Sequence, residues 1–239
     1  MSETPAKHKY HWLPNALTVS RMLLIPVLVW AMLIPFSDSL LGRDFFDPDL
    51  GGTTPLLWAT FLAFGLFLFC IVTDFLDGYL ARKWKITSDF GRMLDPIADK
   101  LLVAASLISI CIILSGTWLV LIPALIIIGR DIFVSGIREH AANSNIILSP
   151  TKLAKWKTAC EMLAILVFLI YLLFQDTNSF GGGWVLYPPL SETMPLSPGG
   201  PVYYAFLALL WLAAILSAYT GYHYFRSAMR QTNPITEFD

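Results

Sequence analysis

The feature that most constrains this chain is a series of six long apolar runs. They lie at about 18–36, 55–80, 93–115, 117–138, 153–174 and 201–225. Each is close to the ~20 residues that a helix needs to cross a ~30 Å hydrocarbon core. The chain of 239 residues is also 56% hydrophobic and only 14% charged, which is too apolar for a soluble domain with a polar surface. We therefore predict an integral membrane protein.

The runs favour an all-α fold with six transmembrane helices. Lengths near twenty residues without alternating polarity fit helices and not the strands of a membrane barrel. Cys70, Cys111 and Cys160 lie inside apolar runs without the spacing of disulfides or zinc ligands, so we expect them to be packing residues. We expect one domain over residues 1–239, with an N-terminal interfacial segment at about 8–17.

The distribution of Lys and Arg predicts the orientation of these helices. Of the sixteen basic residues, fifteen lie near the N-terminus, near the second-to-third or fourth-to-fifth connection, or near the C-terminus. Only Arg43 falls on the other side, and the loop 175–200 has no Lys or Arg. By the positive-inside rule, six crossings place both termini in the cytoplasm, in a multi-pass protein of the inner (cytoplasmic) membrane. We have no functional interpretation of the loop 175–200.

Two of the runs carry paired aspartates at their predicted cytoplasmic ends. Asp74 and Asp77 are spaced i, i+3, and Asp95 and Asp99 are spaced i, i+4, so each pair projects from one helix face. The short link KWKITSDF can bring the two faces together. Because an ionisable group within a span costs about 2.5 to 3.5 kcal/mol, four together indicate a functional site.

The four carboxylates suit a metal centre. They repel one another when gathered in a half-buried place, and a divalent cation relieves that repulsion. Ligation by oxygen alone favours Mg²⁺ or Mn²⁺ over zinc, and four acids can share two ions. Two ions suit displacement at phosphorus. Gly78, Ala81 and Gly91 lie beside the acids, where small residues either let a ligand approach the backbone or serve helix packing.

The full stretch DFLDGYLARKWKITSDFGRMLDPIADK resembles the signature of the CDP-alcohol phosphotransferase family, which reads DxxDGxxAR, eight residues, then GxxxDxxxD. The matching positions are Asp74, Asp77, Gly78, Ala81, Arg82, Gly91, Asp95 and Asp99. Length and helix number are similar as well, so the resemblance implies a CDP-alcohol phosphotransferase-like bundle over the whole chain. It also implies transfer of a substituted phosphoryl group from a CDP-linked lipid to an alcohol, with release of CMP.

The same resemblance implies roles for single residues. Asp74, Asp77 and Asp95 would be metal ligands, and Asp99 would be the general base that activates the alcohol and can also contact a metal. The N-terminal string LPNALTVSRMLLIP is similar to the family too. The nucleotide-side contacts that it implies, together with those of the signature, are Asn15, Thr18, Arg21, Gly78, Ala81, Arg82 and Gly91.

A second group of charges lies in the fourth run and after it. Arg130 is about 20 Å from the outer end of its helix, well inside the membrane, and a buried Arg in a span indicates a functional site. Arg138 shares roughly one face with it, and Lys155 and Lys157 follow. Together they can hold a phosphate-bearing acceptor, with Asp131 as a local counter-charge. The alternative is that they are ordinary anchors at the membrane surface.

The strings RDIFVSGIRE and KLAKWKT resemble the branch of the family whose acceptor is sn-glycerol 3-phosphate. That branch transfers the phosphatidyl group of CDP-diacylglycerol, giving phosphatidylglycerol phosphate and CMP. The alternatives are another acceptor (inositol phosphate, serine or phosphatidylglycerol) and, less favoured, a transporter or a membrane prenyltransferase. The resemblance also implies a homodimer. A net charge of −1 indicates no nucleic-acid partner.

Overall fold

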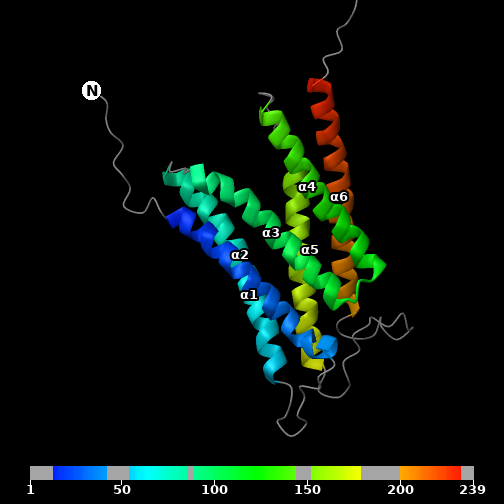
Figure 1. Ribbon diagram of the computed structural model, residues 1–239. Helices are drawn as coiled ribbons and strands as arrows, with labels where there is room; N and C mark the ends of the chain where they lie inside the picture. The colour runs from blue at the N-terminus through cyan, green and yellow to red at the C-terminus, as the bar shows by residue number, and fades with distance from the viewer. Residues whose placement is uncertain (1–12, 42–53, 85–88, 144–151, 179–199, 233–239) are drawn as a thin grey trace, which may run out of the picture. The chain divides into compact units, whose positions relative to one another are not determined.

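In the computed structural model, the described residues are 13–41, 54–84, 89–143, 152–178 and 200–232 (Figure 1). They form six α-helices and, within these ranges, no strand: α1 (Leu13–Leu41), α2 (Thr54–Trp84), α3 (Asp89–Ile113), α4 (Trp118–Asn143), α5 (Lys152–Asn178) and α6 (Gly200–Thr232). Each helix contains a segment long and apolar enough to cross a membrane. The predicted all-α fold of a multi-pass membrane protein is confirmed, and the side on which the termini lie stays a prediction.

The helices extend beyond the apolar runs that predicted them. α2, for example, continues to Trp84, because backbone hydrogen bonding does not stop where the apolar side chains stop. Residues 13–17 form the first turns of α1, while 8–12 lie outside the described residues, so the interfacial position of 8–17 stays a prediction. Most of the loop 175–200 also lies outside the described residues.

The connection from α3 to α4 is a tight turn over 114–117. Ser115 and Gly116 have φ angles of 51° and 65°, a conformation that glycine adopts without a steric penalty. The backbone N–H of Gly116 donates to the carbonyl of Cys111 at 2.7 Å, which closes the end of α3. Ser115 and Gly116 therefore end the helix, at the break between the apolar runs 93–115 and 117–138.

The chain divides into two compact units. The first comprises 1–109 with 175–181, and the second comprises 110–174 with 182–239. In the first unit α1 packs along α2, and Phe67 is completely buried. In the second unit α4 packs against α6, and the rings of Phe168 and Phe206 lie 5.0 Å apart. The single domain expected over 1–239 stays a prediction.

Large apolar side chains cover the outer surface of both units. Leu23 is 71% exposed and Trp118 is 74% exposed, and many Leu, Ile and Phe side chains are similar. Such a surface would promote aggregation in water, whereas lipid tails solvate it well. The charged side chains that remain buried therefore stand out: Arg21 and Asp77 in the first unit, and Lys157 and Glu161 in the second.

Candidate active site

Three of the four signature aspartates converge on one cation in the first unit. Nη1 of Arg21 lies 2.6 Å from Oδ1 of Asp74 and 2.6 Å from Oδ1 of Asp99. Nη2 of the same guanidinium lies 2.5 Å from Oδ2 of Asp77. The acids of α2 and α3 thus point toward the same place, which confirms the expected meeting of the two helix faces.

The fourth aspartate is held by the same face of α1. Oγ1 of Thr18 donates to Oδ1 of Asp95 at 2.6 Å. Thr18 lies three residues before Arg21, so the two side chains leave α1 on one face, and both are buried. One helix face thereby contacts all four acids. We name Arg21, Asp74, Asp77, Asp95 and Asp99, with Thr18, the acidic cluster.

The acidic cluster is closed on one side and open on the other. Arg21 is fully buried and Asp77 is 5% exposed, whereas the side chains of Asp74 and Asp99 are 43% and 41% exposed. A buried guanidinium needs such pairing, because leaving a buried charge without a partner costs about 3 to 5 kcal/mol. Asp74 and Asp99, together with the partly buried Asp95, are the acids that a metal ion or a substrate could reach most directly.

The donor set of the acidic cluster fits a divalent cation. Carboxylate oxygens are the ligands that Mg²⁺ and Mn²⁺ prefer, and here they already converge on a positive group. In the ranges that the structure describes, no group of three or more His, Cys, Asp or Glu residues is arranged to hold a metal ion. The cation that three of the acids surround is Arg21.

For the remaining residues predicted to bind the nucleotide, the structure describes only some of the side chains. Gly78 and Asn15 are half-buried, and Gly91 is buried near the start of α3. Ala81 and Arg82 belong to α2, but their side chains lie outside the described part of the chain. Thr18 and Arg21, expected on the nucleotide side, face carboxylates in this structure. Their nucleotide-binding role stays a prediction.

A second cluster of charges lies in the second unit. Arg130 Nη1 pairs with Asp131 Oδ1 at 2.9 Å, which confirms the predicted counter-charge. Lys157 Nζ lies 2.5 Å from the same carboxylate oxygen and 2.8 Å from Oε1 of Glu161, one turn further along α5. Lys157 and Glu161 are both almost completely buried. Charges from α4 and α5 therefore neutralise one another inside the unit.

The other side of this cluster is built by α6. Nη2 of Arg130 donates to Oγ1 of Thr220 at 2.9 Å, and Nη2 of Arg138 donates to the hydroxyl of Tyr224 at 2.8 Å. The ring of Tyr224 also faces both guanidinium groups, with Cζ to centroid distances of 5.8 Å for Arg130 and 5.0 Å for Arg138. We name these side chains, with Asp131, Lys157 and Glu161, the cationic cluster.

Lys155 lies in α5, and its side chain is outside the described residues.

Sequence reasoning did not single out four residues of this region: Glu161, Thr220, Gly221 and Tyr224. A signal for Glu161 was present, since it is an acid four residues after Lys157 inside an apolar helix. The α6 residues carry no such signal, because Thr, Gly and Tyr are ordinary residues of a membrane helix. Only their contact with Arg130 and Arg138 identifies them.

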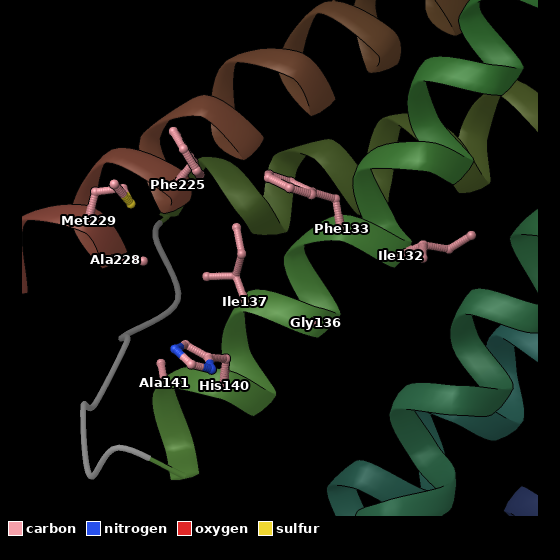
Figure 2. A pocket seen from close by; sticks show the side chains of 9 residues that line it. All are labelled: Ile132, Phe133, Gly136, Ile137, His140, Ala141, Phe225, Ala228 and Met229. Atoms are coloured by element: carbon pink, nitrogen blue, oxygen red, sulfur yellow. The ribbon is translucent and has the colours of Figure 1, made fainter. Parts of the chain in front are cut away.

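An apolar cavity of about 410 Å³ lies between α4 and α6. In Figure 2, Ile137 and His140 of α4 lie opposite Phe225 and Met229 of α6. Apart from His140, the lining offers no charged or hydrogen-bonding side chain. The cavity therefore suits hydrocarbon, and the polar chemistry of the protein must be sought in the two clusters.

Comparison with known proteins agrees with the motif. The model of the CDP-alcohol phosphatidyltransferase family matches residues 11–219. A CDP-diacylglycerol–glycerol-3-phosphate 3-phosphatidyltransferase of Cereibacter sphaeroides is 36% identical over 234 residues, covering 91% of this chain and 95% of that protein. One of the same name from Rickettsia felis is 33% identical, covering 91% and 96%.

A third relative carries a different name. The cardiolipin synthase (CMP-forming) of Oryza sativa subsp. japonica is 36% identical over 176 residues, which is 69% of this chain and 47% of that protein. The CDP-alcohol phosphatidyltransferase family is generally dependent on divalent metal ions. The family model and these relatives, together with the converging aspartates of the signature, show that this membrane protein belongs to the CDP-alcohol phosphatidyltransferase family.

Proposed function

We propose that this enzyme transfers the phosphatidyl group of CDP-diacylglycerol to sn-glycerol 3-phosphate, giving phosphatidylglycerol phosphate and CMP. The observation that carries the proposal is the convergence of the signature acids, with Asp74, Asp77 and Asp99 within 2.6 Å of one cation. The choice of acceptor is supported by the names of the relatives from Cereibacter sphaeroides and Rickettsia felis.

The metal ions are proposed to be Mg²⁺ or Mn²⁺, two per site, held by Asp74, Asp77, Asp95 and Asp99. The formal charges support this number: four carboxylates and one guanidinium leave a surplus of three negative charges in the acidic cluster. When bound, the ions would polarise the phosphoryl oxygens and neutralise charge on the leaving nucleotide. Arg21 contacts Asp74, Asp77 and Asp99 at once and so orients their carboxylates toward one point.

Asp99 is proposed as the general base. The 1-hydroxyl of glycerol 3-phosphate would attack the lipid-linked phosphorus, its proton would pass to the Asp99 carboxylate, and the bond from phosphorus to the CMP oxygen would break. The 41% exposure of the Asp99 side chain supports this role, because the base must be reachable by the hydroxyl. Asp77, at 5% exposure, is less suited to it.

The nucleotide and the acceptor would be bound by the remaining predicted residues. Small residues beside the acids leave room for the cytidine, and Arg82 can donate to the diphosphate. The nucleotide-side set is Asn15, Thr18, Arg21, Gly78, Ala81, Arg82 and Gly91. The acceptor phosphate is assigned to Arg130, Arg138, Lys155 and Lys157. The reaction would take place at the cytoplasmic side of the inner membrane, where the positive-inside rule places these charges.

The test is a panel of acceptors. Purified protein with CDP-diacylglycerol and Mg²⁺ should release CMP when glycerol 3-phosphate is added, and the lipid product should be phosphatidylglycerol phosphate. Serine, inositol phosphate and a no-acceptor sample are the controls. Release of CMP with one of these acceptors and not with glycerol 3-phosphate would contradict the proposed acceptor while leaving the family unchanged.

The rice relative supports one second candidate, a synthase that uses phosphatidylglycerol as acceptor and forms cardiolipin. Phosphatidylglycerol, added to the panel as a further acceptor, separates the two, because it carries no terminal phosphate monoester for the cationic cluster to bind. CMP release with phosphatidylglycerol alone would favour this candidate. Release with glycerol 3-phosphate alone would exclude it.

A further inference from the structure

Tyr224 of α6 lies between the two arginines assigned to the acceptor phosphate. It is 2% exposed, and its ring faces Arg130 and Arg138 at once. Its hydroxyl accepts a hydrogen bond from Nη2 of Arg138 at 2.8 Å. Both guanidinium groups are within cation–π range of this ring, and the negative face of an aromatic ring lowers the energy of each.

Two further α6 residues restrict Arg130. Thr220 accepts a hydrogen bond from Nη2 of Arg130 at 2.9 Å, while its own hydroxyl hydrogen can point to the carbonyl of Leu216 at 2.8 Å. At Gly221 an added Cβ would lie 2.9 Å from Cγ of Arg130. Because Cγ is near the backbone end of that side chain, any larger residue at 221 would move the whole guanidinium.

The exposure of the two arginines differs in a way that suits a ligand. Arg130 is 12% exposed on its side chain and is fixed by Asp131 and Thr220, whereas Arg138 is exposed and is anchored through one nitrogen by Tyr224. A long flexible side chain that is anchored at one nitrogen keeps other donors for an anion while losing little freedom on binding.

We propose that Tyr224, with Gly221 and Thr220, forms a positioning surface on α6 that sets Arg130 and Arg138 for the phosphate of the acceptor. This rests on the proposed function, because it needs glycerol 3-phosphate, or another phosphate-bearing alcohol, as the acceptor. These residues act through the arginines and do not touch the reacting atoms. They should therefore affect acceptor binding selectively and leave the donor lipid unaffected.

The experiment measures KM for glycerol 3-phosphate and for CDP-diacylglycerol in Tyr224→Leu, Tyr224→Phe and Gly221→Ala. In Tyr224→Leu, which removes the ring and the hydroxyl, the acceptor KM should rise by about tenfold. In Tyr224→Phe, which keeps the ring, the rise should be smaller. Gly221→Ala should also raise the acceptor KM. The KM for CDP-diacylglycerol should stay within twofold of wild type in all three.

Matched controls exist on the same helices. Tyr222→Leu removes a 64% exposed tyrosine of α6, and Gly129→Ala adds a Cβ that meets nothing within 4 Å beside Arg130. Both should keep wild-type constants. If Tyr224→Leu does not fold, Tyr224→Phe and Gly221→Ala decide the question.

An unchanged acceptor KM in the folded variants would overturn the positioning role, and so would an equal rise of both KM values. These results differ from a failure of the proposed function. If the proposed function is wrong, the wild-type protein will release no CMP with glycerol 3-phosphate, and the positioning role proposed for Tyr224 will be wrong as well.

Discussion

The acidic cluster and the cationic cluster carry net charges of opposite sign. Among the described side chains of the acidic cluster, one formal positive charge, on Arg21, stands against four aspartates, which leaves a surplus of three negative charges. The cationic cluster has three positive charges, on Arg130, Arg138 and Lys157, and two negative charges, on Asp131 and Glu161, which leaves a surplus of one positive charge. Both clusters reduce the cost of burial by internal pairing.

The difference between the two surpluses indicates what each cluster binds. Three negative charges with two exposed acids suit divalent cations, whereas one positive charge with an exposed arginine suits a phosphate. The cationic cluster also contains an aromatic ring, that of Tyr224, which faces the guanidinium groups of Arg130 and Arg138. The contrast supports the proposal that the acidic cluster binds the metal ions and that the cationic cluster binds the phosphate of the acceptor.

The largest expected effect is that of metal removal. Treatment with excess EDTA should abolish CMP release, because only divalent ions can balance the surplus negative charge of the acidic cluster. Added Mg²⁺ or Mn²⁺ should restore the activity measured before chelation. Full turnover in EDTA would contradict the inference that the acidic cluster binds divalent ions, because the cluster would then need no cation beyond Arg21.

Replacement of the proposed base should come next. Asp99→Asn keeps the size of the side chain and removes its ability to take a proton, so kcat should fall by about 10³-fold. Steady-state kinetics at saturating Mg²⁺ measures it, and size-exclusion profiles show whether the fold is intact. Asp77→Asn is the comparison, since it alters a buried acid of the same cluster. Wild-type kcat in Asp99→Asn would assign the base elsewhere.

An intermediate effect is expected in the cationic cluster. Arg130→Met removes a charge-assisted donor and should raise the KM for glycerol 3-phosphate by about 30-fold, since hydrogen bonds to charged groups contribute about 1.5 to 3 kcal/mol. The metal-ion dependence of the variant should match wild type. If Arg130→Met instead changed the Mg²⁺ concentration needed for activity, the proposed separation of metal binding from acceptor binding would be contradicted.

The smallest effect is expected from a change in the net charge of the cationic cluster. Glu161→Gln removes one negative charge of the cationic cluster, so its surplus rises from one positive charge to two. The KM for glycerol 3-phosphate should then fall by about threefold, because Lys157 keeps its ion pair with Asp131 and the larger positive surplus attracts the acceptor phosphate. Glu161→Asp keeps the charge and is the control. A higher KM in Glu161→Gln would mean that Glu161 serves mainly to hold Lys157 in place.

Much of the fold was predictable because its signals are local. The six helices follow from apolar runs of spanning length, and the stop after α3 follows from Ser115 and Gly116. Asp74 and Asp77, like Asp95 and Asp99, share a face by spacing alone. A link of eight residues then leaves little choice about which two faces meet.

The partners of these charges were not predictable in the same way. Arg21 is 53 residues from Asp74 and 78 residues from Asp99, and Tyr224 is 86 residues from Arg138. Nothing in the spacing of such residues links them, because side chains on different helices meet only when the helices pack. Arg21 was assigned to the nucleotide side for this reason, and its contact with three acids became visible only in the structure.

The sequence by itself determined the six spanning helices and the two acid pairs, since these depend on the length and spacing of residues close together in the chain. The reaction class followed from the resemblance of the aspartate signature to a known family. Only the tertiary structure decided that α1 holds the acids through Thr18 and Arg21, and that α6 holds the arginines through Thr220, Gly221 and Tyr224. The physical reason is that the pairing of buried charge depends on which helix faces pack together, and local periodicity leaves that choice open.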